Sequence, residues 1–203
     1  MAKIHSVCVY CGSGPGNDPV YAATAEALGR EIASHNIRLI YGGGSVGLMG
    51  TIARSVLDAG GNVTGIIPEF LEEREVMLRR VTDLIVTKDM HERKKLMFDK
   101  ADAFVALPGG IGTLEEVVEM MTWAQLGQHK KPILLANIDR FWEPLQQLLN
   151  HMREEAFIRE GMELSYLVEN DVENIVPRLI ASVADASQDA LSVTGDSEPF
   201  RRF

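Results

Sequence analysis

Three glycine-rich segments, each placed directly after a short apolar run, constrain the fold of this chain more than any other feature. They read CGSGPG at 11–16, YGGGSVG at 41–47 and LPGGIG at 107–112. Apolar runs that end in glycine are typical of strands entering a turn, and a segment with helical periodicity follows each of these turns. Strands that alternate with helices in this way form a parallel sheet with helices on both faces.

The whole chain follows this alternation, which predicts a doubly wound α/β fold with a mostly or wholly parallel sheet. The predicted strands are SVCVYCG, IRLIYGG, NVTGIIP, AFVALPGG and PILLAN. The predicted helices span about 18–35, 47–60, 89–100, 113–127, 141–154 and 171–183. No linker divides the sequence, so we expect one domain over 1–183 and a disordered, polar tail over 184–203.

The charge balance excludes some partners. With 20 basic and 29 acidic residues the formal net charge is −9, which disfavours general binding to nucleic acid or to an anionic membrane. The N-terminal segment lacks the pattern of a signal peptide, and no run approaches the length of a membrane span, so a cytoplasmic protein is expected. Cys8 and Cys11 form a CxxC pair on a strand and its exit, where packing is the simpler interpretation than redox or metal chemistry.

All three glycine-rich turns should lie at the carboxyl edge of one sheet, where open α/β sheets bind their ligands. Glycine allows backbone N–H groups to approach a phosphate, and the next helix adds its positive end. Gly42, Gly44 and Gly47 also satisfy GxGxxG, and Glu69 lies at a plausible distance for holding a ribose. A dinucleotide site therefore stays an alternative, although this motif follows the second strand instead of the first.

The segment LPGGIGTLEE lacks the Lys-Ser/Thr ending of a triphosphate-binding loop. Thr113 and Glu116 have the spacing of a capping box, which explains these two residues by helix capping alone. Gly109 and Gly110 in front of them form a backbone nest suited to an anion. Capping and catalysis are both compatible with a carboxylate one turn beyond such a nest.

Two neighbouring helices carry further signals. Arg93 and Lys94 fall on the apolar stripe of a helix that Asp89 should cap, so they point inward, toward an anion. The alternatives are side chains that snorkel to the surface, or an ion pair with a local acid such as Glu92. The helix after LPGGIG is apolar nearly all round, as in TLEEVVEMMTWAQLG. Such a helix is deeply buried or covered by a partner subunit, and we expect a homodimer.

The motifs PGGIGTLEE, MHERK, YGGGSVGLMG and TWAQLG together resemble those of the LONELY GUY family of cytokinin-activating phosphoribohydrolases, once widely labelled lysine decarboxylases. The resemblance covers about residues 5–183 and includes the complete pattern PGGxGTxxE. It implies a Rossmann-like, usually dimeric protein. We expect no metal or cofactor, because the phosphate leaves unbroken and nothing in the sequence resembles a metal cluster. The implied reaction hydrolyses an N6-substituted adenosine 5′-monophosphate to the free base and ribose 5-phosphate.

The resemblance also implies the roles of individual residues. The catalytic pair falls on Arg93 and Glu116. The implied substrate contacts are Glu75, Lys94, Gly109, Gly110, Ile111, Gly112, Thr113, Leu114, Glu115 and Thr122. Ile111 stands where many members have tyrosine, which bears on base preference.

The chemistry of N-glycosidic cleavage fits these roles. The transition state is oxocarbenium-like, so Glu116 would stabilise it or orient the attacking water, while N–H groups of the glycine turn hold the 5′-phosphate. Arg93 stays charged and would hold charge on the phosphate or the leaving base, or fix Glu116. A general purine 5′-monophosphate nucleosidase and a non-catalytic nucleotide-binding or carrier module remain as alternatives. A pyridoxal-dependent decarboxylase fits poorly, because no lysine is placed for a Schiff base.

Overall fold

The computed structural model describes residues 3–71, 77–159, 161–162 and 164–192, with side chains described up to residue 183. Within this part of the chain a seven-stranded sheet has the order β4-β3-β2-β1-β5-β6-β7, and every neighbouring pair is parallel. The strands are β1 (Ser6–Tyr10), β2 (Arg38–Tyr41), β3 (Val63–Pro68), β4 (Asp83–Thr87), β5 (Ala103–Ala106), β6 (Ile133–Ala136) and β7 (Leu167–Glu169). The order reverses between β1 and β5, which makes this point the topological switch of a doubly wound sheet.

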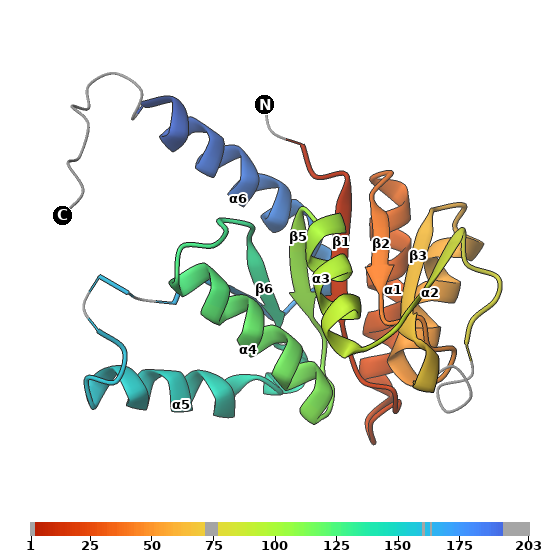
Figure 1. Cartoon of the computed structure of the whole chain (residues 1–203), viewed down its shortest axis with the longest axis horizontal. Helices are drawn as coiled ribbons and strands as arrows, with labels where there is room; N and C mark the ends of the chain where they lie inside the picture. Colours follow the sequence, from red (N-terminus) through yellow and green to blue (C-terminus); the bar gives the residue numbers. More distant parts are fainter. Residues whose placement is uncertain (1–2, 72–76, 160, 163, 193–203) are drawn as a thin grey trace.

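Helices cover both faces of the sheet (Figure 1). They are α1 (Pro19–Ser34), α2 (Gly47–Asp58), α3 (Met90–Lys100), α4 (Ile111–Gln125), α5 (Glu143–Glu154) and α6 (Val172–Ser192), with short 3-10 turns at Glu69–Leu71 and Ile138–Arg140. One core packs α1, α2 and α6 against the sheet, and a second core packs α3, α4 and α5 against the opposite face. The architecture is therefore the three-layer, Rossmann-like α/β fold that the sequence and the resemblance predicted.

The sequence dictates several of these elements locally. Asp18 caps α1 by accepting a hydrogen bond from the Val20 N–H at 2.8 Å, and Pro19 occupies the first helical position, where its missing N–H is not needed. The central strands β1, β3, β5 and β6 are buried along their whole length. Strands covered on both faces become continuous apolar runs, and this made them recognisable in the sequence.

Two strands escaped the sequence prediction, and both lie at an edge of the sheet. In strand β4 only Thr87 is buried and Val86 is exposed, and β7 has only three residues, all partly buried. Edge strands cover less apolar surface and are often short, so their apolar signal is weak. All five strands predicted from apolar runs are present.

The predicted helices are present, with two informative shifts. Helix α4 begins at Ile111 instead of 113, because the chain already turns into helical geometry after Gly110. Helix α6 was predicted to end at 183 but runs to Ser192, so its last nine residues occupy part of the segment assigned to the tail. Residues 193–203 lie outside the described part of the chain. No helix among the described residues is long and apolar enough to cross a membrane.

Candidate active site

The glycine-rich turns after β1 and β5 meet at the switch point of the sheet. The Gly12 N–H donates a hydrogen bond to the Pro108 carbonyl at 3.1 Å, and the Leu48 N–H donates to the Gly12 carbonyl at 3.1 Å. A side chain at Gly12 would lie 3.3 Å from the Gly109 Cα atom, so the two turns approach as closely as backbone allows. The three turns that the sequence placed at one edge are joined by these contacts.

A cavity of about 300 Å³ opens between these turns. Its lining residues come from the turns after β1 and β5, from the starts of α1 and α2 and from the segment before α5: Gly12, Ser13, Gly14, Gly16, Tyr21, Leu48, Pro108, Gly109, Gly110 and Phe141. The rings of Tyr21 and Phe141 meet edge to face at 6.0 Å. The cavity thus joins a backbone-rich, glycine-lined wall to an aromatic wall.

The first turn of α4 borders this cavity, and its geometry corrects one expectation. Gly110 is the N-cap residue and contributes no side-chain cap, so Thr113 is the third helical residue and the predicted capping box between Thr113 and Glu116 is wrong. Thr113 is instead buried against Gly109, where an added Cβ would lie 2.6 Å from the Thr113 Cβ. The N–H groups of this first turn have no carbonyl within the helix to accept them, and together with the helix dipole they favour an anion.

Arg93 of α3 and Glu116 of α4 form a buried pair beneath this edge. The Arg93 Nη2 lies 3.7 Å from the Glu116 Oε1, and the two side chains are only 7% and 11% exposed. Burial raises the pKa of the Cys11 thiol, and the Glu116 carboxylate nearby raises it further. A Cβ added at Gly42, directly after β2, would meet the Arg93 Nη2, so the pair lies at the same edge as the glycine-rich turns.

Lys94 is the next residue on α3 and has different partners. Its Nζ lies 2.6 Å from the Glu115 Oε1 and 3.1 Å from the Glu119 Oε1. Burial tends to lower the pKa of Lys94, but the hydrogen bonds and charges of Glu115 and Glu119 outweigh it, so the pKa is raised. Lys94 thus stays protonated at neutral pH and joins α3 to α4 through its two ion pairs.

The inward direction of Arg93 and Lys94 is confirmed by the burial of both side chains. Glu92, the local acid considered as a partner, pairs with neither of them among the ion pairs of the described residues. The Glu92 carboxylate accepts a hydrogen bond from the Lys88 N–H at 2.8 Å, while Asp89 accepts from the Glu92 N–H at 2.8 Å and caps α3 as predicted. Glu92 therefore serves the start of its own helix. The partners of the two cations come from α4 instead.

The remaining predicted contacts divide into three groups. Gly112 and Ile111 are exposed in the first turn of α4, with Ile111 82% exposed, and Leu114 is partly buried against the α3–α5 core. Thr122 lies elsewhere: its hydroxyl donates to the Val118 carbonyl at 2.8 Å, and it lines a groove between α4 and α5. Glu75 lies outside the described residues.

The residues considered for redox chemistry, metal binding and a dinucleotide site do not come together in one place among the described residues. Cys8 and Cys11 are buried free cysteines that belong to the cores on opposite faces of the sheet, as expected for packing. Among the described residues no group of three or more His, Cys, Asp or Glu side chains could hold a metal ion. Glu69, considered as a ribose contact, is exposed in the 3-10 turn after β3.

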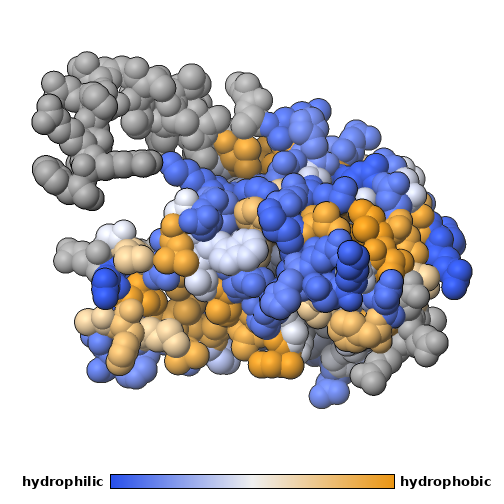
Figure 2. All heavy atoms as spheres, viewed as in Figure 1, coloured by the Kyte–Doolittle hydropathy of each residue, from blue (hydrophilic) through white to orange (hydrophobic). Residues whose placement is uncertain are grey.

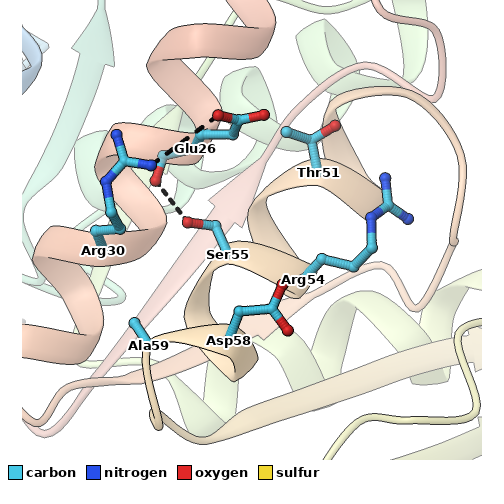
Figure 3. Close-up of a pocket in the computed structure, with 7 residues that line it drawn as sticks. All are labelled: Glu26, Arg30, Thr51, Arg54, Ser55, Asp58 and Ala59. Carbon is cyan, nitrogen blue, oxygen red and sulfur yellow. Dashed lines mark hydrogen bonds and ion pairs between the residues drawn. The ribbon is translucent and has the colours of Figure 1, made fainter.

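A hollow of about 470 Å³ lies between α1 and α2 and includes none of the predicted site residues (Figure 3). Ser55 donates to the Glu26 carbonyl at 2.6 Å across the two helices, and Arg30 pairs with Glu26 at 4.0 Å. Figure 3 shows the Arg54 guanidinium turned away from this pair; it donates to the Ser45 carbonyl at 2.8 Å. The charged groups here serve helix packing, so the glycine-lined cavity is the better candidate site.

Sequence reasoning missed three residues of the site region and one contact. Glu119 shares Lys94 with Glu115, and its i, i+4 spacing from Glu115 was a readable signal. Tyr21 is at the start of the helix after CGSGPG, which was also a usable signal. Phe141 and the closeness of Gly42 to Arg93 come from segments far apart in sequence, and no local pattern could have shown them.

Fold and site together define a Rossmann-like α/β protein with a glycine-lined cavity at the edge of the sheet and a buried arginine–glutamate pair beneath it. A family model described as possible lysine decarboxylase matches residues 49–179. The chain is 50% identical over 153 residues to a probable cytokinin riboside 5′-monophosphate phosphoribohydrolase of Oryza sativa subsp. japonica, covering 75% of this chain and 69% of the relative. It is 45% identical over 172 residues to the cytokinin riboside 5′-monophosphate phosphoribohydrolase of Rhodococcoides fascians, covering 84% and 87%.

The chain belongs to the LONELY GUY family of phosphoribohydrolases, which the family model describes by the older decarboxylase label. Among solved structures, it resembles the Moco carrier protein from Chlamydomonas reinhardtii, with a TM-score of 0.65 and 21% identity, covering 89% of this chain and 98% of that one. At this identity the similarity concerns the fold alone.

Proposed function

We propose that this protein hydrolyses the N-glycosidic bond of N6-substituted adenosine 5′-monophosphates, and of AMP, to the free base and ribose 5-phosphate. The observation that carries this proposal is the buried pair of Arg93 and Glu116 at the glycine-lined edge. Simple binding of a nucleotide does not require a buried carboxylate at that place. The similarity to cytokinin riboside 5′-monophosphate phosphoribohydrolases at 45–50% identity supports the same reaction.

Glu116 would act on the ribose. Cleavage passes through a sugar that is positively charged at the anomeric carbon, so a nearby carboxylate stabilises the transition state more than the ground state. In a buried setting this charge interaction is strengthened, because less water screens it. The same carboxylate could orient or deprotonate the attacking water.

The first turn of α4 would hold the 5′-phosphate on the N–H groups of Gly110, Gly112 and Thr113. Binding energy from the phosphate fixes the sugar over Glu116, which is why a monophosphate should react faster than a nucleoside. Arg93 keeps its charge and would hold the phosphate or the leaving base, and it orients Glu116.

Lysine decarboxylation is not supported by the state of the lysine at this site. A pyridoxal enzyme needs a lysine that can lose its proton to form a Schiff base. The Lys94 ammonium is instead held by two carboxylates, and its pKa is raised. The residues at this edge therefore do not fit a pyridoxal cofactor.

A substrate panel tests the proposal. We would incubate the protein with AMP, GMP, isopentenyladenosine 5′-monophosphate and the matching nucleosides, and separate the released bases by chromatography. We expect release from adenine monophosphates, fastest with the N6-substituted one. Equal rates with GMP would favour the general purine nucleosidase; equal rates with nucleosides would contradict the phosphate anchor; no release with intact binding would favour the carrier module.

The homodimer predicted from the apolar α4 is part of this proposal. Apolar side chains gather over α5 and the adjoining part of α4 in Figure 2, and the groove between these helices measures about 250 Å³. Val118 and Phe157 in this groove are 38% and 84% exposed. Exposed apolar surface of this kind is typical of an interaction site, and a second copy would cover it.

The dimer would also account for Thr122. If α4 packs antiparallel against the α4 of a second copy near Val118, then Thr122 lies against the first turn of the partner's helix, where the phosphate would bind. Val118→Glu should convert dimers into monomers in sedimentation velocity, whereas Val86→Glu, on the exposed edge strand β4, should leave the dimer intact. A dimer that survives Val118→Glu would contradict this interface. The cytoplasmic location stays a prediction.

A further inference from the structure

The residues that the structure describes give the Arg93 guanidinium few polar contacts. A guanidinium has five N–H donors, yet within the described residues its Nε has no hydrogen-bond partner, and Nη1 meets only the Met90 sulfur at 3.6 Å. The pairing of Nη2 with Glu116 is long, at 3.7 Å. Among the described residues, packing around the guanidinium therefore bears on where it lies.

Gly42, at the carboxyl end of β2, supplies that shape. A Cβ added at Gly42 would overlap the Arg93 Nη2, and it would lie 3.3 Å from the Arg93 Cζ and 3.1 Å from the Met49 sulfur. The Gly42 backbone does not have the left-handed conformation that favours glycine, unlike its neighbour Gly43, whose φ is +82°. Backbone geometry therefore permits a side chain at 42, and the Arg93 guanidinium fills the space that such a side chain would take.

We propose that Gly42 is a positioning residue for the reaction, because its missing side chain makes the space in which the Arg93 guanidinium lies beside Glu116. Its function in the YGGGSVG segment is thus steric, separate from phosphate binding. The atom that a new side chain meets first is the tip of a flexible arginine, which can move aside at small cost to the fold. A substitution here should displace the arginine and spare the stability.

The test rests on the proposed function and uses Gly42→Ala in the full chain. We expect kcat for an adenine monophosphate to fall by about 10- to 100-fold, as for loss of a preorganised charged group. We expect the melting temperature to change little. A crystal structure of this variant should place the guanidinium farther from Glu116 than in the parent protein.

A double-mutant cycle separates action through Arg93 from general damage. In the Arg93→Ala background, Gly42→Ala should change kcat/KM and the calorimetric affinity for AMP by less than about 2-fold, because residues that act through one another are not additive. An undiminished loss in that background would overturn the proposal. So would recovery of activity in Gly42→Ala/Met49→Ala, since crowding would then act through Met49.

Gly61→Ala is the matched control, because its Cβ would crowd Val56 at 2.7 Å, on helix α2. We expect a lower melting temperature with kcat within about 2-fold of the parent. If the parent protein releases no base, the proposed function fails; if it does and Gly42→Ala keeps full activity, or its crystal structure leaves the guanidinium in place, the positioning role fails.

Discussion

Arg93 and Lys94 are adjacent cations on α3 that face adjacent acids on α4, yet their environments differ. Lys94 is bound by two carboxylates at 2.6 and 3.1 Å, and one of them, Glu115, is half exposed. Arg93 is more deeply buried and has one long pairing at 3.7 Å with Glu116. The lysine is satisfied by the protein itself, whereas the arginine keeps most of its hydrogen-bonding capacity unused among the described residues.

This difference indicates that the two cations have different roles, one in substrate binding and one in stability. Burying a charge with incomplete pairing costs stability, so a fold retains such a group mainly where a ligand completes it. A charge whose bonds are already complete orders the structure and has little left for a substrate. We therefore propose that the Arg93–Glu116 pair acts on the substrate and that Lys94 mainly joins α3 to α4; its predicted substrate contact stays a prediction.

The largest expected effect is from Glu116→Gln, which keeps the shape of the side chain and removes its charge. Because the carboxylate would stabilise a positive transition state, kcat should fall by about 100- to 1000-fold while AMP still binds. Release of the base from isopentenyladenosine monophosphate measures the rate, and calorimetry measures binding. Full activity in this variant would show that Glu116 has no part in the mechanism. It would also contradict the different roles given to the Arg93 and Lys94 ion pairs.

Arg93→Lys should have the next largest effect. A lysine keeps the charge but lacks the planar fork that can contact Glu116 and a phosphate together, so kcat/KM should fall by about 10- to 100-fold. Steady-state kinetics with AMP check this. The matching exchange Lys94→Arg should cost less than about 3-fold, and the reverse ranking would contradict the assignment.

Lys94→Met should affect stability more than chemistry. Loss of the two pairings should lower the free energy of unfolding by about 1 kcal/mol, which corresponds to about 2–4 °C in melting temperature, while kcat falls less than about 10-fold. Calorimetry measures the first and base release the second. Lys95→Met removes an exposed pair with Asp99 and should change neither quantity measurably.

The pH dependence of the same variant gives a further check. Because Glu115 and Glu119 raise the pKa of Lys94 above that of an unfolded lysine, the stabilisation is complete below about pH 10 and is lost as the pH rises through the raised pKa. The stability difference between the parent and Lys94→Met should therefore stay constant from about pH 6 to pH 9 and shrink above about pH 10.5. A difference that grows with alkaline pH would contradict the pairing.

The smallest expected effect separates the two acids that hold Lys94. Glu119 is more deeply buried than Glu115, with side-chain exposures of 25% and 50%, and its Oε2 is a buried atom without a hydrogen-bond partner among the described residues. Glu119→Gln and Glu115→Gln should each change kcat by less than about 3-fold. Chemical denaturation should show the larger loss of stability for Glu119→Gln. The opposite order would mean that Glu115 is the more important partner of Lys94.

Much of the fold could be predicted because its central strands are buried on both faces. Strands such as Val63–Pro68 and Ile133–Ala136 must be apolar throughout, and each ends in a turn that the next helix requires. The edge strands Asp83–Thr87 and Leu167–Glu169 are not under that constraint, and the sequence did not reveal them. The start of α4 was misplaced because Thr113 and Glu116 have the spacing of a cap that the backbone does not use.

The sequence by itself determined the alternation of strands and helices, the glycine-rich edge and the inward direction of Arg93 and Lys94, because these follow from local periodicity and from what glycine permits. Only the tertiary structure decided which acid faces which cation, that Thr122 lies in a separate groove, and that Gly42 leaves the space that Arg93 fills. These features depend on how β2, α3 and α4 pack together, and spacing along the chain contains no information about distances between elements far apart in sequence.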